Sequence, residues 1–383
     1  MNRVLFVSNG HGEVAIAARL AMELQSLRPV ACDHLALVGD FRYPSMMREV
    51  GPRRAMPSGG VIAMGNVRNI ARDVRAGLLA HTLAQWRFLR SVRGTYALAV
   101  GVGDVFALLM ALRARAHKTA FVGTAKSAYV AKYGVLERRV VHKADAVFVR
   151  DEATAGQLSA HGIAARAANA IVDLYAADAS ALDVPFEPLL AIFPGSRESA
   201  YDEAPFLCEV AAAVARREPQ AGAVLSIAPG IDARRMSALF EERGWEIVRG
   251  AGENEPFTLR RDGREVVRAW RGPLGAMLAR ATIVLGQAGT ANEAAAARGI
   301  PVVAFARSGE RRAPWYRMRQ IGLLGEAMIV APRETDAAAA EVLSLLHDAS
   351  RRERMGRAGR ERMGAPGAAA TIAAALAALV HGS

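Results

Sequence analysis

The chain has 383 residues, a length that suits two domains with separate hydrophobic cores. Its 52% hydrophobic and 6% aromatic content is typical of a helix-rich globular protein and excludes a disordered one. The two cysteines, Cys32 and Cys208, form no CxxC pair, which argues against a zinc site or a disulfide framework and fits a reducing cytoplasm. The net charge of +12 attracts phosphates, nucleic acid or an anionic membrane surface, although a GC-rich genome would produce the same arginine excess.

Residues 3–175 alternate short apolar strands with helical patterns, which predicts a parallel α/β sheet. Gly, Asp or Ser follows each strand, so polar residues collect at the carboxyl ends of the strands, where open α/β sheets bind ligands. No apolar segment of signal-peptide length precedes the first strand, and a cytoplasmic location is expected. The predicted strands are Arg3–Val7, His34–Val38, Ala97–Val100, Thr119–Val122 and Ala146–Val149.

The first strand runs into the turn Ser8–Glu13, SNGHGE, ahead of a helix predicted over Val14–Leu27. The glycines Gly10 and Gly12 allow the backbone to approach a ligand closely. His11 is the titratable side chain of this turn that can exchange a proton near neutral pH. It is a candidate catalytic acid or base, and the alternative is a polar loop residue that helps to cap the helix.

The segment 58–93 places apolar residues at helical spacing beside an arginine-rich face. Such a helix lies on a membrane surface, lines an acceptor groove, or packs on the sheet. The next strand ends in Gly101–Asp104, GVGD, before an apolar helix predicted over Val105–Leu112. Asp104 is there a candidate general base, and the competing interpretation is a helix N-cap.

Residues 176–188 break the periodicity and are the predicted linker. The second α/β unit begins with the strand Leu189–Phe193 and the tight turn Pro194–Arg197, whose arginine could clamp a diphosphate. Three further strands are expected: one at Val224–Ala228, and two that form a hairpin around Asp262-Gly263, at Phe257–Arg261 and Arg264–Trp270.

The stretch Val284–Phe305, VLGQAGTANEAAAARGIPVVAF, reads as a strand end, a Gly turn, a helix opening at Thr290 and a second strand. Thr290 and Glu293 have the spacing of a capping box. Alternatively, the helix N-terminus holds a phosphate and Glu293 takes both hydroxyls of a ribose. Near the C-terminus, Met363–Val380 is mostly alanine and is expected to be a packed helix.

Five motifs together resemble the GT-B glycosyltransferases, and more specifically lipid-A-disaccharide synthase and the lipid-A-disaccharide-synthase-related proteins. The motifs are SNGHGE at Ser8–Glu13, GVGD at Gly101–Asp104, ADAVFVRDEATAGQLSAHGI at Ala144–Ile163, FPGSR at Phe193–Arg197 and QAGTANEAAAARGIPVVAF at Gln287–Phe305. The resemblance implies an α/β GT-B architecture, two Rossmann-like domains facing across a cleft. The implied domains are an acceptor-side domain 1–175, a linker 176–188, a nucleotide-sugar domain 189–360 and a C-terminal helix 361–383 that crosses back to the first domain.

The resemblance also implies roles for single residues. Gly289 and Thr290 would meet the diphosphate of a UDP-sugar, Glu293 the ribose, and Ser196-Arg197 the phosphates from the other side. Asp104 would be the general base, with His11 assisting. The remaining implied donor positions are Gly195, Gln287 and Ala288, and the implied acceptor or sugar contacts are Asn9, Gly10, Gly12, Arg319 and Gln320.

The implied reaction is inverting, metal-independent transfer from a UDP-sugar, acylated UDP-glucosamine among the candidates, to a lipid-linked or amphipathic acceptor. No cofactor beyond this substrate and no nucleic acid partner is expected, and the location allows peripheral attachment to the inner face of the cytoplasmic membrane. Orthodox synthases carry AGEASGD where this chain has SNGHGE, and relatives carry GNPMMD at Ala168–Asp173. The first change removes the acidic pattern near the acceptor, so the acceptor need not be a lipid A precursor. The alternatives are a UDP-GlcNAc 2-epimerase-like enzyme and a non-catalytic nucleotide-sugar-binding protein.

Overall fold

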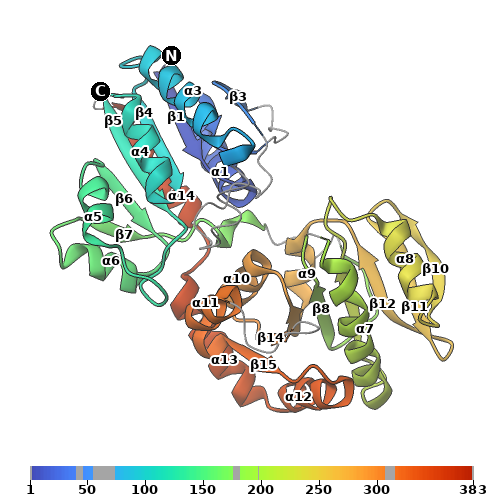
Figure 1. Ribbon diagram of the computed structural model, residues 1–383. Helices are drawn as coiled ribbons and strands as arrows, with labels where there is room; N and C mark the ends of the chain where they lie inside the picture. Colours follow the sequence, from blue (N-terminus) through green and yellow to red (C-terminus); the bar gives the residue numbers. More distant parts are fainter. Residues whose placement is uncertain are drawn as a thin grey trace. The chain divides into compact units, whose positions relative to one another are not determined.

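The computed structural model divides into two compact units, each built on its own sheet (Figure 1). Unit 1 comprises Met1–Leu174 with Pro366–Ser383, and unit 2 comprises Tyr175–Ala365. The chain therefore passes from one unit to the other twice. The structure describes residues 2–39, 46–54, 74–175, 182–196, 198–306 and 315–381.

The sheet of unit 1 is parallel throughout, in the order β3-β2-β1-β4-β5-β6-β7. Strand order reverses between β1 and β4, and open α/β sheets bind ligands outside the carboxyl ends of the strands at such a switch point. The SNGHGE and GVGD turns follow β1 and β4, so they lie at this point. The strands are β1 (Asn2–Ser8), β2 (Val30–Ala36), β3 (Met47–Glu49), β4 (Leu98–Gly103), β5 (Lys118–Gly123), β6 (Ala146–Val149) and β7 (Ala165–Ala167).

Helices cover both faces of this sheet, because successive residues of its strands point to opposite sides. Phe6 packs in the core formed with α1 and α14, whereas Leu5 and Val7 pack in the core formed with α3 and α4. The helices are α1 (His11–Leu27), α3 (Leu78–Ser91), α4 (Val105–Arg113), α5 (Val135–Val141), α6 (Glu152–Ser159), the short 3₁₀ helix η1 (Val172–Leu174) and α14 (Ala368–His381).

The C-terminal helix α14 packs on α1, as the sequence predicts, and buries Ile372 and Leu376 completely in the core of unit 1. By length and composition alone, the stretch Ala349–Val380 is apolar enough to cross a membrane. Its apolar part is instead this core helix, whose start is held by the Asp173 carboxylate through the backbone N–H groups of Gly367 and Ala369, at 2.7 and 2.6 Å.

The sheet of unit 2 has the order β10-β11-β12-β9-β8-β13-β14-β15 and is parallel from β12 to β15. The predicted hairpin is confirmed: β11 and β12 pair antiparallel around Asp262 and Gly263, which have φ angles of 53° and 71°. The strands are β8 (Leu189–Phe193), β9 (Gly222–Ser226), β10 (Glu246–Gly252), β11 (Glu255–Arg261), β12 (Arg264–Trp270), β13 (Ile283–Gly286), β14 (Val302–Phe305) and β15 (Met328–Ala331).

Close helix packing fixes α10 in unit 2. A Cβ atom added to Gly359 of α13 would lie 2.3 Å from the carbonyl oxygen of Ala296, and one on Gly356 would lie 2.5 Å from that of Gly299. Only glycine allows this approach, so α13 holds the C-terminal half of α10. The helices are α7 (Ala200–Arg217), α8 (Ala233–Glu241), α9 (Leu274–Arg280), α10 (Gly289–Ala297), α11 (Trp315–Leu324), η3 (Gly325–Ala327), α12 (Thr335–His347) and α13 (Ala349–Met363).

Two predicted strands begin and end too late: β2 begins at Val30, four residues before the predicted His34, and β9 begins at Gly222, two residues before the predicted Val224. β2 ends at Ala36 and β9 ends at Ser226, whereas the apolar runs continue to Val38 and Ala228. Apolar character marks burial and not sheet pairing, so these runs extend past the C-terminal ends of the two strands. In the predicted amphipathic segment 58–93, residues 58–73 lie outside the described residues, as do 176–181 of the predicted linker.

Candidate functional site

Neighbouring strands bring the two predicted donor motifs together in unit 2. β8 pairs with β13 so that Phe193 lies opposite Gly286, and the N–H group of Gln287 donates to the carbonyl of Phe193 at 2.8 Å. The turns that follow these strands therefore lie side by side at the carboxyl ends of the parallel strands. We call this edge, formed by Gly195, Ser196 and Gln287–Thr290, the donor edge.

The N-cap residue of α10, at the donor edge, supplies no side-chain cap. It is Ala288, with φ −99° and ψ 127°, and no side chain accepts from the first turn at that position. Thr290 is the second residue of the helix, so the predicted capping box of Thr290 and Glu293 is wrong. Within the part of the chain that the structure describes, the N-cap side chain leaves the first N–H groups of α10 and the positive end of its dipole to another acceptor, such as a phosphate.

The backbone around this helix start is open. Gly195 has φ 118°, and a Cβ atom placed on it would meet nothing within 4 Å. Gly289 and Ser196 are exposed, and a Cβ atom on Gly289 would meet only Gln320, at 3.8 Å. The donor edge can therefore admit a bulky group close to the main chain. Arg197, the predicted phosphate clamp, lies outside the described residues.

Asn292 fixes the turn before α10 and was missed from the sequence. This fully buried side chain donates to the carbonyl oxygen of Gly286 at 3.3 Å and to Oε1 of Gln320 at 3.4 Å. A Cβ atom on Gly286 would lie 1.9 Å from Asn292 Oδ1, so this strand must end in glycine. Gln320 donates in turn to the carbonyl of Gly289 at 3.2 Å, while Arg319 is half-buried beside it on α11.

Gln287 has a positioning role in the structure. Its amide donates to Glu203 at 2.9 Å and to the carbonyl of Phe305 at 3.0 Å, and it accepts from Arg317 at 3.5 Å. Glu203 is buried and pairs with Arg333 at 2.8 Å. These contacts use the side-chain amide, and the backbone N–H group of Gln287 already donates to the carbonyl of Phe193, so the residue holds the turn in place.

Tyr175 reaches the donor edge from the start of unit 2. Burial raises the pKa of its phenol, a hydrogen bond with Thr290 lowers it, and the negative charge of Glu293 raises it further. The net direction is upward, so the phenol is neutral at physiological pH and keeps its proton for donation. The sequence singled out Thr290 and Glu293 but not this tyrosine, which is more than a hundred residues away in the chain.

In unit 1, Asp104 is the N-cap of α4. Its Oδ1 atom accepts from the N–H group of Ala107 at 2.9 Å, which confirms the capping interpretation. The half-buried carboxylate lies at the carboxyl end of β4, beside the switch point of the sheet. Capping and proton transfer are compatible because the cap bond engages one carboxylate oxygen, and the general-base role stays a prediction.

Glu13, the last residue of the SNGHGE turn, fills a hollow made by two glycines. Gly10 and Gly103 have φ angles of 97° and 119°. A Cβ atom on Gly10 would lie 2.9 Å from Glu13 Oε2, and one on Gly103 would lie 2.9 Å from Glu13 Cγ. The Glu13 side chain therefore lies against the turn that carries Asp104. Tertiary placement decides this contact, since 90 residues separate Glu13 from Gly103.

The other first-turn candidates fall at the start of α1. The helix begins at His11, three residues before the predicted Val14, because Gly10 serves as its N-cap. The His11 side chain lies outside the described part, and Gly12 is exposed with open space around it. Asn9 Oδ1 is buried without a hydrogen-bond partner among the described residues, which leaves it able to accept from a ligand.

A buried histidine supports the end of β1. His34 Nε2 lies 2.8 Å from the Ser8 hydroxyl, and both residues are fully buried. Burial, followed by the positive charge of Arg53, lowers the pKa of His34 to about 3. The imidazole is therefore neutral at physiological pH, and its role here is structural.

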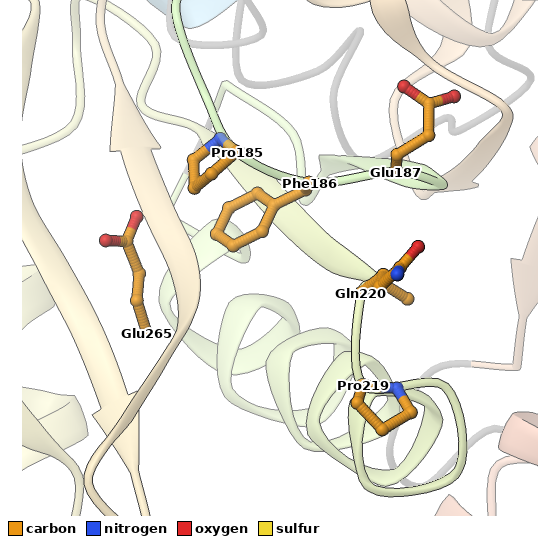
Figure 2. A pocket seen from close by; sticks show the side chains of 7 residues that line it. Pro185, Phe186, Glu187, Pro219, Gln220 and Glu265 are labelled. Atoms are coloured by element: carbon orange, nitrogen blue, oxygen red, sulfur yellow. The ribbon is translucent and has the colours of Figure 1, made fainter.

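A cavity of about 460 Å³ lies at the opposite edge of unit 2 (Figure 2). Its lining residues precede β8 and β9 or begin β12, so it is at the amino ends of these parallel strands. Two carboxylates, Glu187 and Glu265, lie on this cavity and would repel a nucleotide diphosphate. The donor edge, and not this cavity, has the chemistry of an anion site.

Comparison with known proteins identifies the fold of the chain. No protein family model and no curated protein matches the chain. The calicheamicin glycosyltransferase CalG4 aligns over 100% of this chain and 98% of its own, with a TM-score of 0.58 and 16% identity. Acinetobacter baumannii MurG covers 100% of both chains at a TM-score of 0.56 and 12% identity. UDP-GlcNAc 2-epimerase from Neisseria meningitidis, bound to UDP-GlcNAc, covers 100% of both at 0.53 and 12%.

These structures and the two parallel-rich sheets show a two-domain, Rossmann-like GT-B architecture, which confirms the predicted fold class.

Proposed function

We propose that the chain is an inverting glycosyltransferase that moves a sugar from a UDP-sugar to a lipid-linked or amphipathic acceptor, in the manner of lipid-A-disaccharide synthase. The observation that carries this proposal is the uncapped N-terminus of α10 beside the open Gly195 turn. The full-length likeness to CalG4 and to an epimerase bound to UDP-GlcNAc supports a sugar-nucleotide substrate.

On the donor side, the N–H groups of Gly289 and Thr290 bind the diphosphate, and Glu293 takes the ribose hydroxyls. Ser196 contacts the phosphates from the neighbouring turn, and Arg197, which lies outside the described residues, keeps its predicted role as a phosphate clamp. As the bond from the anomeric carbon to the diphosphate oxygen breaks, UDP leaves with the electron pair. The helix dipole and the N–H groups stabilise this growing negative charge without a bound cation.

On the acceptor side, a hydroxyl oxygen attacks the anomeric carbon and Asp104 takes its proton. The new bond forms on the face opposite the departing diphosphate, so the configuration inverts. His11 assists or orients, and Glu13 adds a second carboxylate at the same turn. Asn9 Oδ1, which has no partner in the described structure, is suited to accept from an acceptor hydroxyl or amide.

The exposed face of α3 is the reason for proposing a lipid-linked or amphipathic acceptor. Leu79, Leu83 and Trp86 are 67%, 45% and 38% exposed at helical spacing. Arg113 stacks on the Trp86 ring with its guanidinium carbon 4.3 Å from the centroid, and residues 74–103 contain no Asp or Glu. An apolar stripe among arginines fits an anionic membrane surface. Co-sedimentation with anionic but not with neutral vesicles is expected, and protein that stays in the supernatant with both contradicts it.

The first test of the donor site is a thermal-shift titration with UDP, UMP, ADP and GDP. UDP at about a hundred times its dissociation constant adds roughly 2.7 kcal/mol to the free energy of unfolding. Glu293→Gln should weaken the response to UDP, because it removes the carboxylate that takes the ribose hydroxyls. Glu353→Gln, on the exposed face of α13, should respond like the wild type. If none of the four nucleotides raises the melting temperature, the shared fold would be the only remaining support for the proposal.

An enzyme resembling UDP-GlcNAc 2-epimerase is the second candidate, favoured by the likeness to the Neisseria structure. The two activities differ in their need for an acceptor. Incubation of the protein with UDP-GlcNAc alone should leave the sugar unchanged if it is a transferase. Release of the 2-epimer of this nucleotide sugar would decide for the second candidate.

A further inference from the structure

Three neighbouring strands of unit 1 end level with one another. The last residues of β4 and β6, Gly103 and Val149, both lie opposite Gly123, the last residue of β5. The turns that follow carry, in this order across the sheet, Asp104, Thr124 and Asp151. We call these three residues the polar row. Because neighbouring strands are about 4.8 Å apart, the strands that carry its two ends are about 10 Å apart.

Hydrogen bonds hold the turns of the polar row together. The N–H group of Thr124 donates to the carbonyl of Gly103 at 3.0 Å, and its carbonyl accepts from the guanidinium of Arg150 at 3.1 Å. The hydroxyl of Thr154 accepts from a backbone N–H group of the turn after β5 at 2.8 Å and donates to Asp151 Oδ1 at 2.6 Å. The side chains of the row are therefore held on a fixed backbone.

The polar row contains two buried oxygens that have no hydrogen-bond partner among the described residues, Thr124 Oγ1 and Asp151 Oδ2. The two residues are only 7% and 4% exposed. Asp151 uses its other oxygen, Oδ1, to cap α6, where it accepts from the N–H group of Thr154 at 2.7 Å. Burial of a carboxylate oxygen without a donor costs free energy, so a donor from outside the chain, such as a ligand hydroxyl, fits beside Asp151 Oδ2.

Tyr133 places a phenol beside the middle of the polar row. A Cβ atom on Gly123 would lie 2.6 Å from the Tyr133 hydroxyl oxygen, so this hydroxyl lies against the end of β5. Burial, followed by the charge of Glu137, raises the pKa of the phenol, and Asp104 and Asp151 act in the same direction. The phenol is therefore neutral at physiological pH and can donate. Acceptors and a donor thus lie together, which suits a hydroxyl group, because a hydroxyl both donates and accepts.

We propose that Thr124 and Asp151 are specificity-determining residues that bind a second hydroxyl of the acceptor while a first one reacts at Asp104. The second hydroxyl donates to Asp151 Oδ2 and accepts from Thr124 Oγ1. A single sugar ring, with a hydrogen bond at each end, bridges the distance of about 10 Å between the outer strands. The acceptor therefore carries a ring with several hydroxyls as its head group. This inference rests on the proposed function and names the group that its acceptor must carry.

The experiment compares the binding of two matched amphiphiles, octyl glucoside and its fully O-methylated ether. Methylation keeps the ring, the tail and the ether oxygens, and it removes every O–H donor. NMR titration of the whole protein below the micelle concentration gives both dissociation constants. The parent protein should bind octyl glucoside about threefold to tenfold more tightly than the ether, because only the free sugar can donate to Asp151.

Asp151→Asn and Thr124→Val remove the two contacts separately. Asparagine still caps α6 through its carbonyl oxygen, but it presents an NH₂ donor where the ligand hydroxyl needs an acceptor. Valine is close to threonine in shape and lacks the hydroxyl. Each variant should bring the ratio of the two dissociation constants towards one. Asp232→Asn makes the same change at the exposed N-cap of α8 and should keep the parental ratio.

Unfolding in urea distinguishes a ligand-binding hydroxyl from a structural one. Because Thr124 Oγ1 has no partner in the described part of the chain, Thr124→Val should leave the urea midpoint of the ligand-free protein unchanged or raise it. A lowered midpoint together with the parental ratio would give this hydroxyl a structural role and refute the inference.

The thermal shift with UDP, measured on the same proteins, separates this inference from the proposed function. If the parent responds to UDP but binds the glucoside no better than the ether, the inference is wrong and the donor proposal stands. The same conclusion follows if both variants keep the parental ratio. If the parent prefers the glucoside and loses this preference in both variants but does not respond to UDP, the hydroxyl site stands and the transferase proposal falls.

Discussion

The carboxyl edges of the two sheets are built from the same kind of turn but are occupied differently. In unit 1, the Asp104 side chain caps α4, and Glu13 fills the hollow above Gly103. In unit 2, the N-cap residue of α10 is an alanine that supplies no side-chain cap, and Gly195 faces open space among the described residues. One edge thus supplies carboxylates, which accept protons and repel anions, whereas the other supplies backbone N–H groups that the N-cap side chain does not engage and that attract anions. The same architecture carries two complementary chemistries because of these few side chains.

The largest effect is expected from Asp104→Asn, which separates the two roles of this residue. Asparagine caps a helix as well as aspartate, so the melting temperature should change little. It cannot take a proton, and kcat should fall about 10²- to 10⁴-fold with UDP binding retained. Steady-state kinetics with calorimetry checks both. Asp348→Asn makes the same change at the exposed N-cap of α13 and should leave kcat unaltered. Equal turnover of the Asp104 variant would refute the assignment.

Acid should affect the two units unequally, because the edge of unit 1 rests on His34. The pKa of this residue is about 3 in the folded protein, against an ordinary value of 6.5 for a histidine side chain. Below the pKa that His34 has in the unfolded chain, this side chain binds a proton when the chain is unfolded and does not bind it when the chain is folded. The contribution of His34 to the free energy of unfolding is therefore fully present above that pKa. It falls by about 1.4 kcal/mol per pH unit as the pH is lowered towards the pKa of His34 in the folded protein. Denaturant unfolding followed in unit 1 at about pH 7 and about pH 5 should show this loss, and His34→Gln should abolish it.

The contrast between the helix starts can be reversed by giving α10 the cap of α4. Ala288 already has the extended conformation of an N-cap, so Ala288→Asp should stabilise the ligand-free protein by about 1 kcal/mol. The same carboxylate would occupy and repel the diphosphate site, and UDP affinity should fall about tenfold or more. Ala288→Ser adds a cap without a charge and should lose less affinity. Unchanged UDP binding by Ala288→Asp would show that the nucleotide does not use this helix start.

Local patterns predicted the elements and the turns, because strands, glycines and the Asp262-Gly263 hairpin are encoded by neighbouring residues. The side-chain cap of α4 was recognisable for the same reason. The start of α10 was misjudged because Thr290 has the right chemistry for a cap but the backbone enters the helix one residue earlier, at Gly289. The spacing of Thr290 and Glu293 in the sequence cannot distinguish a helix capped by Thr290 from one that begins at Gly289.

Contacts between segments that are distant in the chain could not be predicted from the sequence. Gln287 was predicted as a donor residue, yet its amide contacts Glu203, 84 residues away in the chain. Glu13 and Tyr175 were overlooked because their partners, Gly103 and Thr290, come from other turns. In each case the tertiary fold brings the residues together, and that fold follows from the whole chain.

The smallest expected effect compares two glycines that share one backbone conformation. Gly103 and Gly195 have φ angles of 119° and 118°, so an alanine at either position carries a similar backbone strain. Only at Gly103 would the new methyl group meet a side chain, Glu13 Cγ at 2.9 Å. Gly103→Ala should therefore lower the free energy of unfolding by about 1 kcal/mol more than Gly195→Ala does. Adding Glu13→Ala should remove the excess, because the hollow is then empty; an excess that persists would place the cost in the backbone and not in the filled hollow.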